Sequence, residues 1–251
     1  FILEPEETFS CCIPYADAGN QFKIQWNDKN GILEKKYFFI PLVPSKGFSW
    51  DEDFSDFQHC PPLKLGSENR VSRFPEISYG GSNDLSAEIR MMYDRTNLYL
   101  GIKVLDDIHS TPFSSKNKPQ FLWANDAIQL AFDNRRFPGF IEFSLSGTPY
   151  GPEIFVSPFR DVEKKDIKFK VIRRDAFTTY KIKIPWKALW KNDISSDFPE
   201  IRFNIAIVDN DGDPKRTFSQ PYIGDKQALQ LTPGLFSGGK TSESFAWLLL
   251  K

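Results

Sequence analysis

The sequence has few residues of the kinds that build metal centres, redox sites or covalent active sites. Its 251 residues include three cysteines, two histidines and two methionines. Cys11 and Cys12 are adjacent and Cys60 stands apart, so no Cys-x-x-Cys pair or cysteine–histidine cluster indicates zinc or thiol redox chemistry. Cys60 could form one disulfide with either member of the adjacent pair, so cysteine use alone does not identify the compartment.

The motifs of several enzyme classes are also absent. Gly-x-Ser-x-Gly, which places a nucleophilic serine on a sharp turn, does not occur, and neither do the phosphate-binding patterns Gly-x-x-x-x-Gly-Lys and Gly-x-Gly-x-x-Gly. A serine–histidine–acid arrangement would have to use His59 or His109, and both lie in loop-like sequence. A pair of catalytic carboxylates cannot be recognised in the sequence, because their separation depends on the fold. We expect a binding module rather than an enzyme.

The charge balance and the hydropathy exclude two further classes of partner. Lysine and arginine number 32 against 33 aspartates and glutamates, so the basic surplus that binds nucleic acid is missing. No apolar run approaches the roughly 18 residues that span a bilayer. The first residues, FILEPEETFS, lack the pattern of a signal peptide, so we expect that any export signal has been removed or was never there.

Aromatic residues are abundant, and their placement predicts strands. The chain has 24 Phe, 8 Tyr and 6 Trp, with 15 Gly and 18 Pro to form turns. Apolar and polar residues alternate in LSAEIRMMY, NLYLGIKVL, DAIQLAFD, GFIEFSLS, IKFKVIR, TTYKIKI and IRFNIAIV. Strict alternation is typical of antiparallel strands with one buried face. We therefore predict an all-β fold, an antiparallel β-sandwich of jelly-roll or immunoglobulin-like type, with one short helix at residues 185–190 (PWKALW).

The N-terminal part of the chain differs from the rest. QFKIQW and YFFIPLV are expected strands, with a turn at Asn30-Gly31 between them. This stretch is too short to bury a core of its own. We predict that residues 1–46 form a β-hairpin extension packed on or linked to the main module, which comprises residues 47–251; the alternative is the tail of an upstream module.

Acidic residues gather at the ends of two expected strands. Asp106 and Asp107 end one strand, and Asp209 and Asp211 end another, while Asp126 begins a third. Closely spaced carboxylates suit calcium, which takes six to eight oxygen ligands. The alternative is an ordinary solvated turn, because Asp, Asn and Gly favour turns.

One tryptophan differs from the others by its neighbours. Trp123 lies on a loop before a strand, close to Asn125 and Gln129, whereas Trp50 is expected to plug one end of the sandwich. An indole face can stack on the C–H face of a sugar while amides bind its hydroxyls. Trp123 is therefore a candidate sugar platform, and a loop-anchoring core tryptophan is the alternative.

Four motifs occur in order between residues 47 and 251. They are EIRMMYDRTNLYLGIKVLDDIH, LWANDAIQLAFD, TTYKIKIPWKAL and IRFNIAIVDNDGD. Together they resemble the family 9 carbohydrate-binding modules and their DOMON-like relatives. The resemblance implies a β-sandwich with structural calcium that binds glucose- or xylose-type sugars, often at chain ends.

The resemblance also implies site residues. A stacking tryptophan of the family falls on Trp123, and a polar sugar contact falls on Gln129. The family's second stacking aromatic comes from a loop near the C-terminus, which here has no tryptophan, so Phe236 and Tyr222 are the candidates to replace it. A strand amide of the family falls on Ala206, so the sugar site is carried over in part.

We therefore expect a non-catalytic module that binds a polysaccharide or oligosaccharide. The resemblance implies an extracellular or periplasmic location and an attached or accompanying polysaccharide-active enzyme. One alternative is a sandwich that has lost its ligand and serves as an interaction domain. A second is a DOMON-like haem binder that uses Met91 or Met92 with His109 as axial ligands, although Met91 shares a face with Ile89 and could simply pack in the core.

Overall fold

The protein is a β-structure in which strands dominate. The computed structural model describes residues 20–28, 31–51, 53–71, 79–117, 119–133, 139–156, 166–189, 201–211, 226–235 and 241–250. For residues 20–36, 226 and 227 it describes the backbone alone. These residues form 13 strands, which confirms the predicted all-β class.

The strands and helices follow one another in this order. The first strands are β1 (Asn20–Asp28), β2 (Gly31–Pro44), β3 (Leu63–Leu65), β4 (Leu85–Tyr93), β5 (Asn97–Asp106), β6 (Ala127–Asp133) and β7 (Ile141–Thr148). The later strands are β8 (Gly151–Val156), β9 (Lys168–Arg174), β10 (Phe177–Pro185), β11 (Ile201–Asn210), β12 (Lys226–Gln230) and β13 (Ala246–Leu250). Short 3-10 helices are η1 (Ser55–Phe57), η2 (Ser67–Asn69) and η3 (Pro119–Ala124), and the helix predicted at PWKALW is α1 (Trp186–Leu189).

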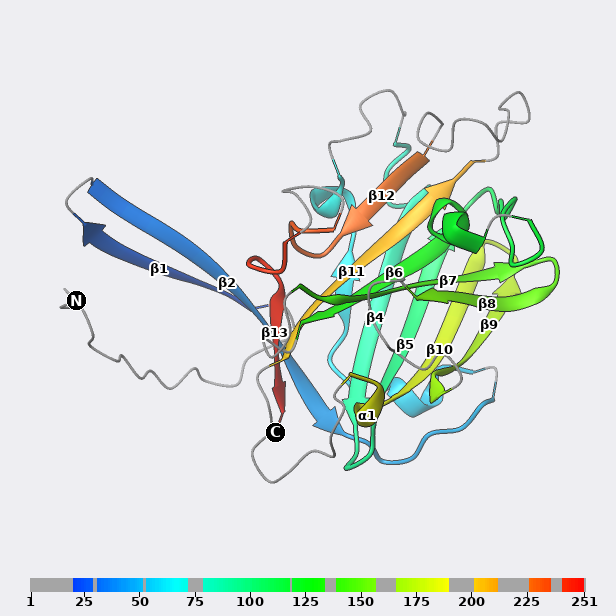
Figure 1. Cartoon of the computed structure of the whole chain (residues 1–251), viewed down its shortest axis with the longest axis horizontal. Coiled ribbons are helices and arrows are strands. Elements are labelled where there is room, and N and C mark those ends of the chain that lie inside the picture. Colours follow the sequence, from blue (N-terminus) through cyan, green and yellow to red (C-terminus); the bar gives the residue numbers. More distant parts are fainter. Residues whose placement is uncertain are drawn as a thin grey trace.

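The strands form one continuous sheet whose two halves face each other across a core (Figure 1). Its order is β8-β7-β6-β11-β13-β2-β4-β5-β10-β9, with β1, β12 and β3 paired at the side. The predicted sandwich is confirmed, and most pairs are antiparallel. The exceptions are at β2, which runs parallel to both β13 and β4 and so joins the two halves.

The alternating residues of the facing strands build the core. In the β4–β5 hairpin Ile89 lies opposite Ile102, and both are completely buried. On the other half Ile128 and Leu130 of β6 and Phe143 of β7 are buried in the same cluster. Alternation places these apolar side chains on the inner face and leaves the residues between them on the outer face.

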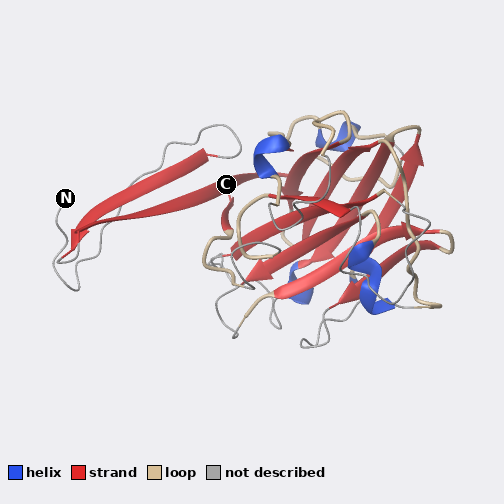
Figure 2. Ribbon diagram, turned by 90° about the horizontal axis from the view of Figure 1, so that it is seen from above, coloured by secondary structure: helices blue, strands red, loops and turns tan. Residues whose placement is uncertain are grey.

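The N-terminal hairpin reaches away from the sandwich. β1 pairs with the outer part of β2, from Asp28 opposite Gly31 to Asn20 opposite Phe39, and this arm extends from the body in two views (Figures 1 and 2). The predicted turn at Asn30-Gly31 falls partly outside the described residues, and Gly31 is the first residue of β2. Beyond Phe39, β2 becomes a strand of the main sheet. The domain boundary between residues 46 and 47 stays a prediction.

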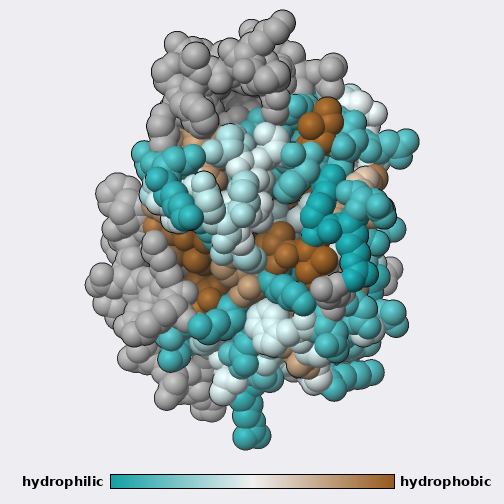
Figure 3. All heavy atoms as spheres, turned by 90° about the vertical axis from the view of Figure 1, so that its right-hand side faces the viewer, coloured by the Kyte–Doolittle hydropathy of each residue, from teal (hydrophilic) through white to brown (hydrophobic). Residues whose placement is uncertain are grey.

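The free edges of the two halves meet along one side. Strands β8 and β9 are the ends of the sheet order, and they lie near each other. Half-buried Ile154 and Val171 pack against the core there, and a Cβ at Gly147 would lie 3.0 Å from the Val171 side chain. Seen from this side, hydrophilic side chains cover most of the surface around a hydrophobic patch (Figure 3). The absence of a side chain at Gly147 lets the two halves of the sheet approach closely.

Candidate functional site

Trp123 lies in η3, a short helix that leads into β6. The helix is placed against β6, β7 and β8, and the Trp123 side chain is half-buried. The indole is thus neither sealed in the core nor fully exposed. A stacking platform needs a ring that is supported on one side and accessible on another, and the half-buried state of Trp123 is compatible with this role.

Asn125, next to η3, fastens a neighbouring loop rather than facing outward. Its side chain is completely buried. Its Oδ1 accepts from the Phe113 amide at 2.9 Å, and its Nδ2 donates to the Phe113 carbonyl at 2.9 Å and to Ser146 Oγ at 3.2 Å. Because the amide is fully used inside the chain, we leave Asn125 out of the proposed sugar contacts and assign it to positioning η3.

Asp126 continues this anchoring. Its carboxylate accepts hydrogen bonds from the backbone amides of Ser110 and Asn210, and the Asn210 side chain donates to the Ala124 carbonyl at 2.9 Å. The C-terminal end of η3 is therefore tied to β11 and to the loop that follows β5.

Gln129 lies on the outer face of β6, in a row that crosses several strands. On one side, Gln129 pairs with Ser144 of β7, which pairs with Phe155 of β8. On the other side, Gln129 pairs with Ala206 of β11, which pairs with Gln230 of β12. Ser144, Gln129 and Gln230 are all buried polar residues. The row offers hydroxyl and amide groups without a charged side chain.

Two polar atoms on this face have no hydrogen-bond partner in the part of the chain that the structure describes. They are Gln129 Oε1 and Thr232 Oγ1, and both residues are at least nine-tenths buried. Thr232 follows β12 and is held by Asn204, whose Nδ2 donates to the Thr232 carbonyl at 2.7 Å. A buried acceptor without a donor costs about 1–3 kcal/mol, so a hydroxyl of a ligand or of water would be stabilised at these atoms.

The predicted acidic residues separate into two clusters. In the first, Asp106, His109 and Asp126 bring their ligand atoms within 4.8 Å of one another. His109 Nδ1 lies 3.1 Å from Asp126 Oδ2, and Arg173 donates to Asp106 Oδ2 at 3.1 Å. Hydrogen bonds to Asp106 and Asp126 raise the pKa of His109 to about 9. The two carboxylates are thus already neutralised by His109 and Arg173, so this cluster does not suit calcium.

The second cluster consists of three carboxylates. Asp209 and Asp211 meet Asp84, which precedes β4, with ligand atoms within 4.8 Å of one another. Burial, followed by the charges of Asp84 and nearby aspartates including Asp107, raises the pKa of Asp211 to about 6. Asp211 Oδ1 is buried and accepts no hydrogen bond from the described residues. This donor set fits a hard cation, and a calcium ion there would hold the start of β4 to the end of β11.

The sequence analysis did not predict Asp84, Thr232 or Gln230 as site residues. Two of the residues that it did predict cannot be placed. Phe236 and Tyr222 fall outside the described residues. Asp107 is exposed and reaches the second cluster through its charge. The Asn83-Asp84 turn was the available signal for Asp84, but its partner strand lies far along the chain.

The residues considered for haem are used in packing and pairing. Met91 belongs to the main core, and Met92 belongs to a separate cluster with Phe57, Cys60 and Tyr99. Cys60 is a buried free thiol. Since His109 is bound to aspartates, none of these side chains is arranged as an axial ligand among the described residues.

Comparison with known families identifies the class of protein. Residues 67–221 match the family described as carbohydrate family 9 binding domain-like. This match covers more than half of the chain, so the protein belongs to that family, a class of non-catalytic carbohydrate-binding modules. A comparison with curated proteins gives no match. No helix among the described residues is long and apolar enough to cross a membrane.

Solved structures show the same fold. A family 9 carbohydrate-binding module from Caldicellulosiruptor kristjanssonii in complex with glucose is 11% identical, with a TM-score of 0.58 over 84% of this chain and 95% of that one. The same module in complex with cellotriose is 12% identical, with a TM-score of 0.56 over 84% and 93%. A protein from Bacteroides uniformis is 10% identical, with a TM-score of 0.58 over 84% and 98%.

Proposed function

We propose that this module binds a neutral sugar of the glucose type at the outer face of β6, β7, β11 and β12. Trp123 stacks on the sugar ring, and Gln129 accepts a hydrogen bond from a sugar hydroxyl. The observation that carries the proposal is the buried Oε1 of Gln129, which has no hydrogen-bond partner among the described residues and lies inside the segment that matches the family. A sugar hydroxyl is a donor that can satisfy this acceptor.

The chemistry of the row supports a neutral ligand. Ser144, Gln129 and Gln230 offer both donors and acceptors, as sugar hydroxyls require, and the row contributes no charge that would have to be balanced. The related module from Caldicellulosiruptor kristjanssonii was crystallised with glucose and with cellotriose, which supports the choice of glucose-type sugars for the first experiments.

Titration calorimetry with glucose, cellotriose and xylotriose tests the proposal. The native chain should bind at least one of them, and Trp123→Ala and Gln129→Ala should each weaken binding by roughly tenfold or more, which corresponds to about 1.4 kcal/mol. Phe177→Ala is the matched control, because Phe177 is an aromatic residue that is 39% exposed outside the proposed site.

Two results would contradict this assignment. Unchanged affinity in Trp123→Ala would reject the platform. Failure of the folded native chain to bind any neutral or acidic sugar would favour the alternative in which the sandwich is an interaction domain without a ligand.

We also propose that calcium binds at Asp84, Asp209 and Asp211 and has a structural role. The support is the donor set described above, three carboxylates whose ligand atoms lie within 4.8 Å of one another. Calcium requires more ligands than these three aspartates provide, and water or carbonyl oxygens would complete its shell. The DOMON-like relationship stays a prediction.

We further propose that the module acts outside the cytoplasm beside a polysaccharide-active enzyme, in keeping with its family. Fusion to an endoglucanase tests the accessory role. The fusion should release more reducing sugar from insoluble cellulose than the enzyme alone, and the same fusion carrying Trp123→Ala should lose this gain. Equal release by both fusions would count against the role.

A further inference from the structure

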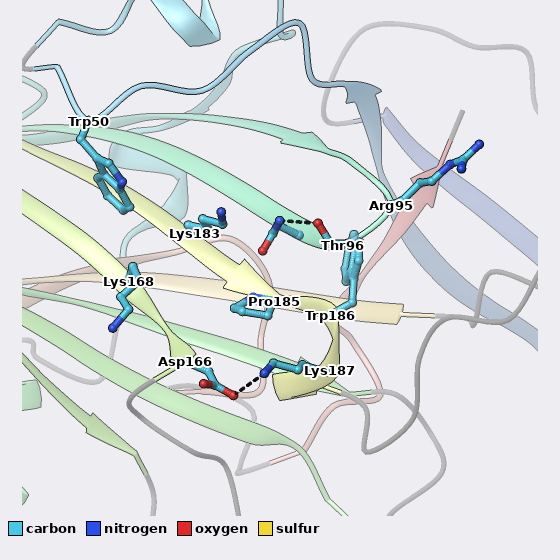
Figure 4. A pocket seen from close by; sticks show the side chains of 10 residues that line it. Trp50, Arg95, Thr96, Asp166, Lys168, Lys183, Pro185, Trp186 and Lys187 are labelled. Carbon is cyan, nitrogen blue, oxygen red and sulfur yellow. Dashed lines mark hydrogen bonds and ion pairs between the residues drawn. The ribbon is translucent and has the colours of Figure 1, made fainter.

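A groove of about 690 Å³ lies on the other half of the sandwich, away from the Gln129 row. Trp50 borders it from the segment before η1, and Lys168 and Lys183 come from the paired strands β9 and β10. Arg95 of the β4–β5 turn, Lys187 of α1 and Asp166 complete its rim (Figure 4). The groove thus combines the exposed Trp50 with four basic residues, and the buried Trp186 forms part of its wall.

Trp50 is exposed although the sequence predicted that it would plug the end of the sandwich. It is 40% exposed, and its indole extends from its loop into the groove (Figure 4). The ring is nevertheless supported, because Phe48 packs edge-to-face against it with ring centroids 4.8 Å apart. Lys170 Nζ donates to the Trp50 carbonyl at 3.2 Å and so fixes the backbone. A supported indole with an open surface can stack on a sugar ring.

The basic residues of the groove are poorly neutralised. Lys168 and Lys183 are direct cross-strand partners, so their side chains start from the same face of the sheet. Their ammonium groups point apart (Figure 4), and that of Lys183 lies 5.8 Å from the centre of the Tyr99 ring. Like charges placed opposite each other destabilise a sheet. The acid on the rim, Asp166, is engaged by Lys187 at 3.1 Å, and neither Lys168 nor Lys183 has an ion-pair partner among the described residues. An anion bound in the groove would give both lysines a counter-charge.

We propose that this groove is a second saccharide site, specific for an acidic sugar such as a uronic acid residue. The C–H face of the sugar packs on Trp50, and the sugar carboxylate lies between Lys168 and Lys183. A simple inorganic anion would use the lysines but gain nothing from the indole. The two sites together suit a polysaccharide that carries both neutral and acidic residues.

Titration calorimetry with trigalacturonate at low ionic strength tests this site. The native chain should bind trigalacturonate, and added salt should weaken the binding because the lysine–carboxylate attraction is screened. Trp50→Ala, Lys183→Gln and Lys168→Gln should each weaken it by roughly tenfold. Lys64→Gln on β3 and Phe177→Ala are matched controls for an exposed lysine and an exposed aromatic residue, and both should bind as the native chain does.

The other outcomes separate this proposal from the neutral-sugar site. All groove variants should keep the native affinity for neutral sugar, which also shows that they are folded. Failure of trigalacturonate to bind would overturn the second site and leave the first untouched. Loss of trigalacturonate binding in Trp123→Ala would place the acid at the first site instead. Competition by inorganic sulfate together with native affinity in Trp50→Ala would show a plain anion site and would equally reject the proposal.

Discussion

At the scale of the residue, Lys181 shows how a buried charge can keep its hydrogen-bond partners. Its side chain is fully buried, and its Nζ donates to Asp56 Oδ2 at 3.0 Å and to the carbonyls of Asp51 and Asp53 at 3.2 Å. The ring of Phe48 lies 5.4 Å from the ammonium group. These partners belong to the segment that crosses the outer face of β10, so Lys181 fastens that segment to the sheet.

Replacing this lysine should therefore destabilise the fold. We expect Lys181→Met to lower the free energy of unfolding by about 3 kcal/mol, because it leaves Asp56 and two carbonyls without their donor. Urea unfolding measures the loss. Lys103→Met, at an exposed lysine of β5, should change stability by less than about 0.5 kcal/mol, and equal losses in both variants would refute this role of Lys181.

His109 makes stability depend on pH. Its pKa is raised from 6.5 to about 9 by hydrogen bonds to Asp106 and Asp126. A raised histidine pKa means that the folded state binds the proton more tightly, so the stabilisation is complete below about pH 6.5 and is lost as the pH rises through about 9. The melting temperature should fall over this window by about 2–4 °C for each kcal/mol lost.

The matched test compares the two histidines. His109→Asn should remove most of this fall between pH 6.5 and 9, whereas His59→Asn should retain it. A native melting temperature that stays flat over the same window would count against the ion pair.

At the scale of the element, β5 has a glycine where the aromatic segment crosses it. A Cβ at Gly101 would lie 2.6 Å from Phe57 Cδ2 and 2.7 Å from Phe54 Cε2, closer than real Cβ contacts. The glycine is thus required by the approach of η1 to the outer face of the strand. This contact also positions the segment that carries Trp50.

Adding one methyl group here should have a measurable cost. We expect Gly101→Ala to destabilise the protein by about 1–3 kcal/mol, because both rings must move. Thermal unfolding followed by circular dichroism measures the change. The combined variant Gly101→Ala with Phe57→Leu should recover part of the loss, and a fully stable Gly101→Ala would show that the rings are loosely packed.

The elements also show how far sequence reasoning reached. The alternation in β4 and β5 predicted the buried faces of Ile89 and Leu100 because the period of a strand is local. The same reasoning could not predict that Asn125 binds the backbone of Phe113. A side-chain amide next to a loop tryptophan can hydrogen-bond either a ligand or the backbone of the chain, and the sequence does not distinguish the two. The exposure of Trp50 also depends on where its segment crosses a distant strand, which no local pattern encodes.

At the scale of the whole molecule, the Asp84, Asp209 and Asp211 cluster connects the two halves of the sandwich. Asp84 precedes β4 of one half, while Asp209 lies at the end of β11 of the other and Asp211 follows that strand. The sequence predicted Asp209 and Asp211 as metal ligands but not Asp84, because these residues come from turns that only the fold brings together. A cation bound there would stabilise the contact between the halves.

Calcium should therefore raise the melting temperature of the native chain. At a concentration one hundred times its Kd, binding contributes about 2.7 kcal/mol, or roughly 5–10 °C for a chain of this size. Differential scanning fluorimetry with calcium and with EDTA measures the shift. Asp84→Asn should abolish it and Asp107→Asn should largely preserve it; an equal shift in both variants would argue against this assignment.

The double membership of β2 has a mechanical consequence. Its residues 39–42 pair in parallel with β13, Val43 and Pro44 pair in parallel with β4, and the same strand continues outward as the N-terminal arm. A force applied through the arm is loaded as shear on both ladders at once, so their hydrogen bonds must break together rather than unzip one by one. A module tethered through this strand can resist being pulled apart while it grips its substrate.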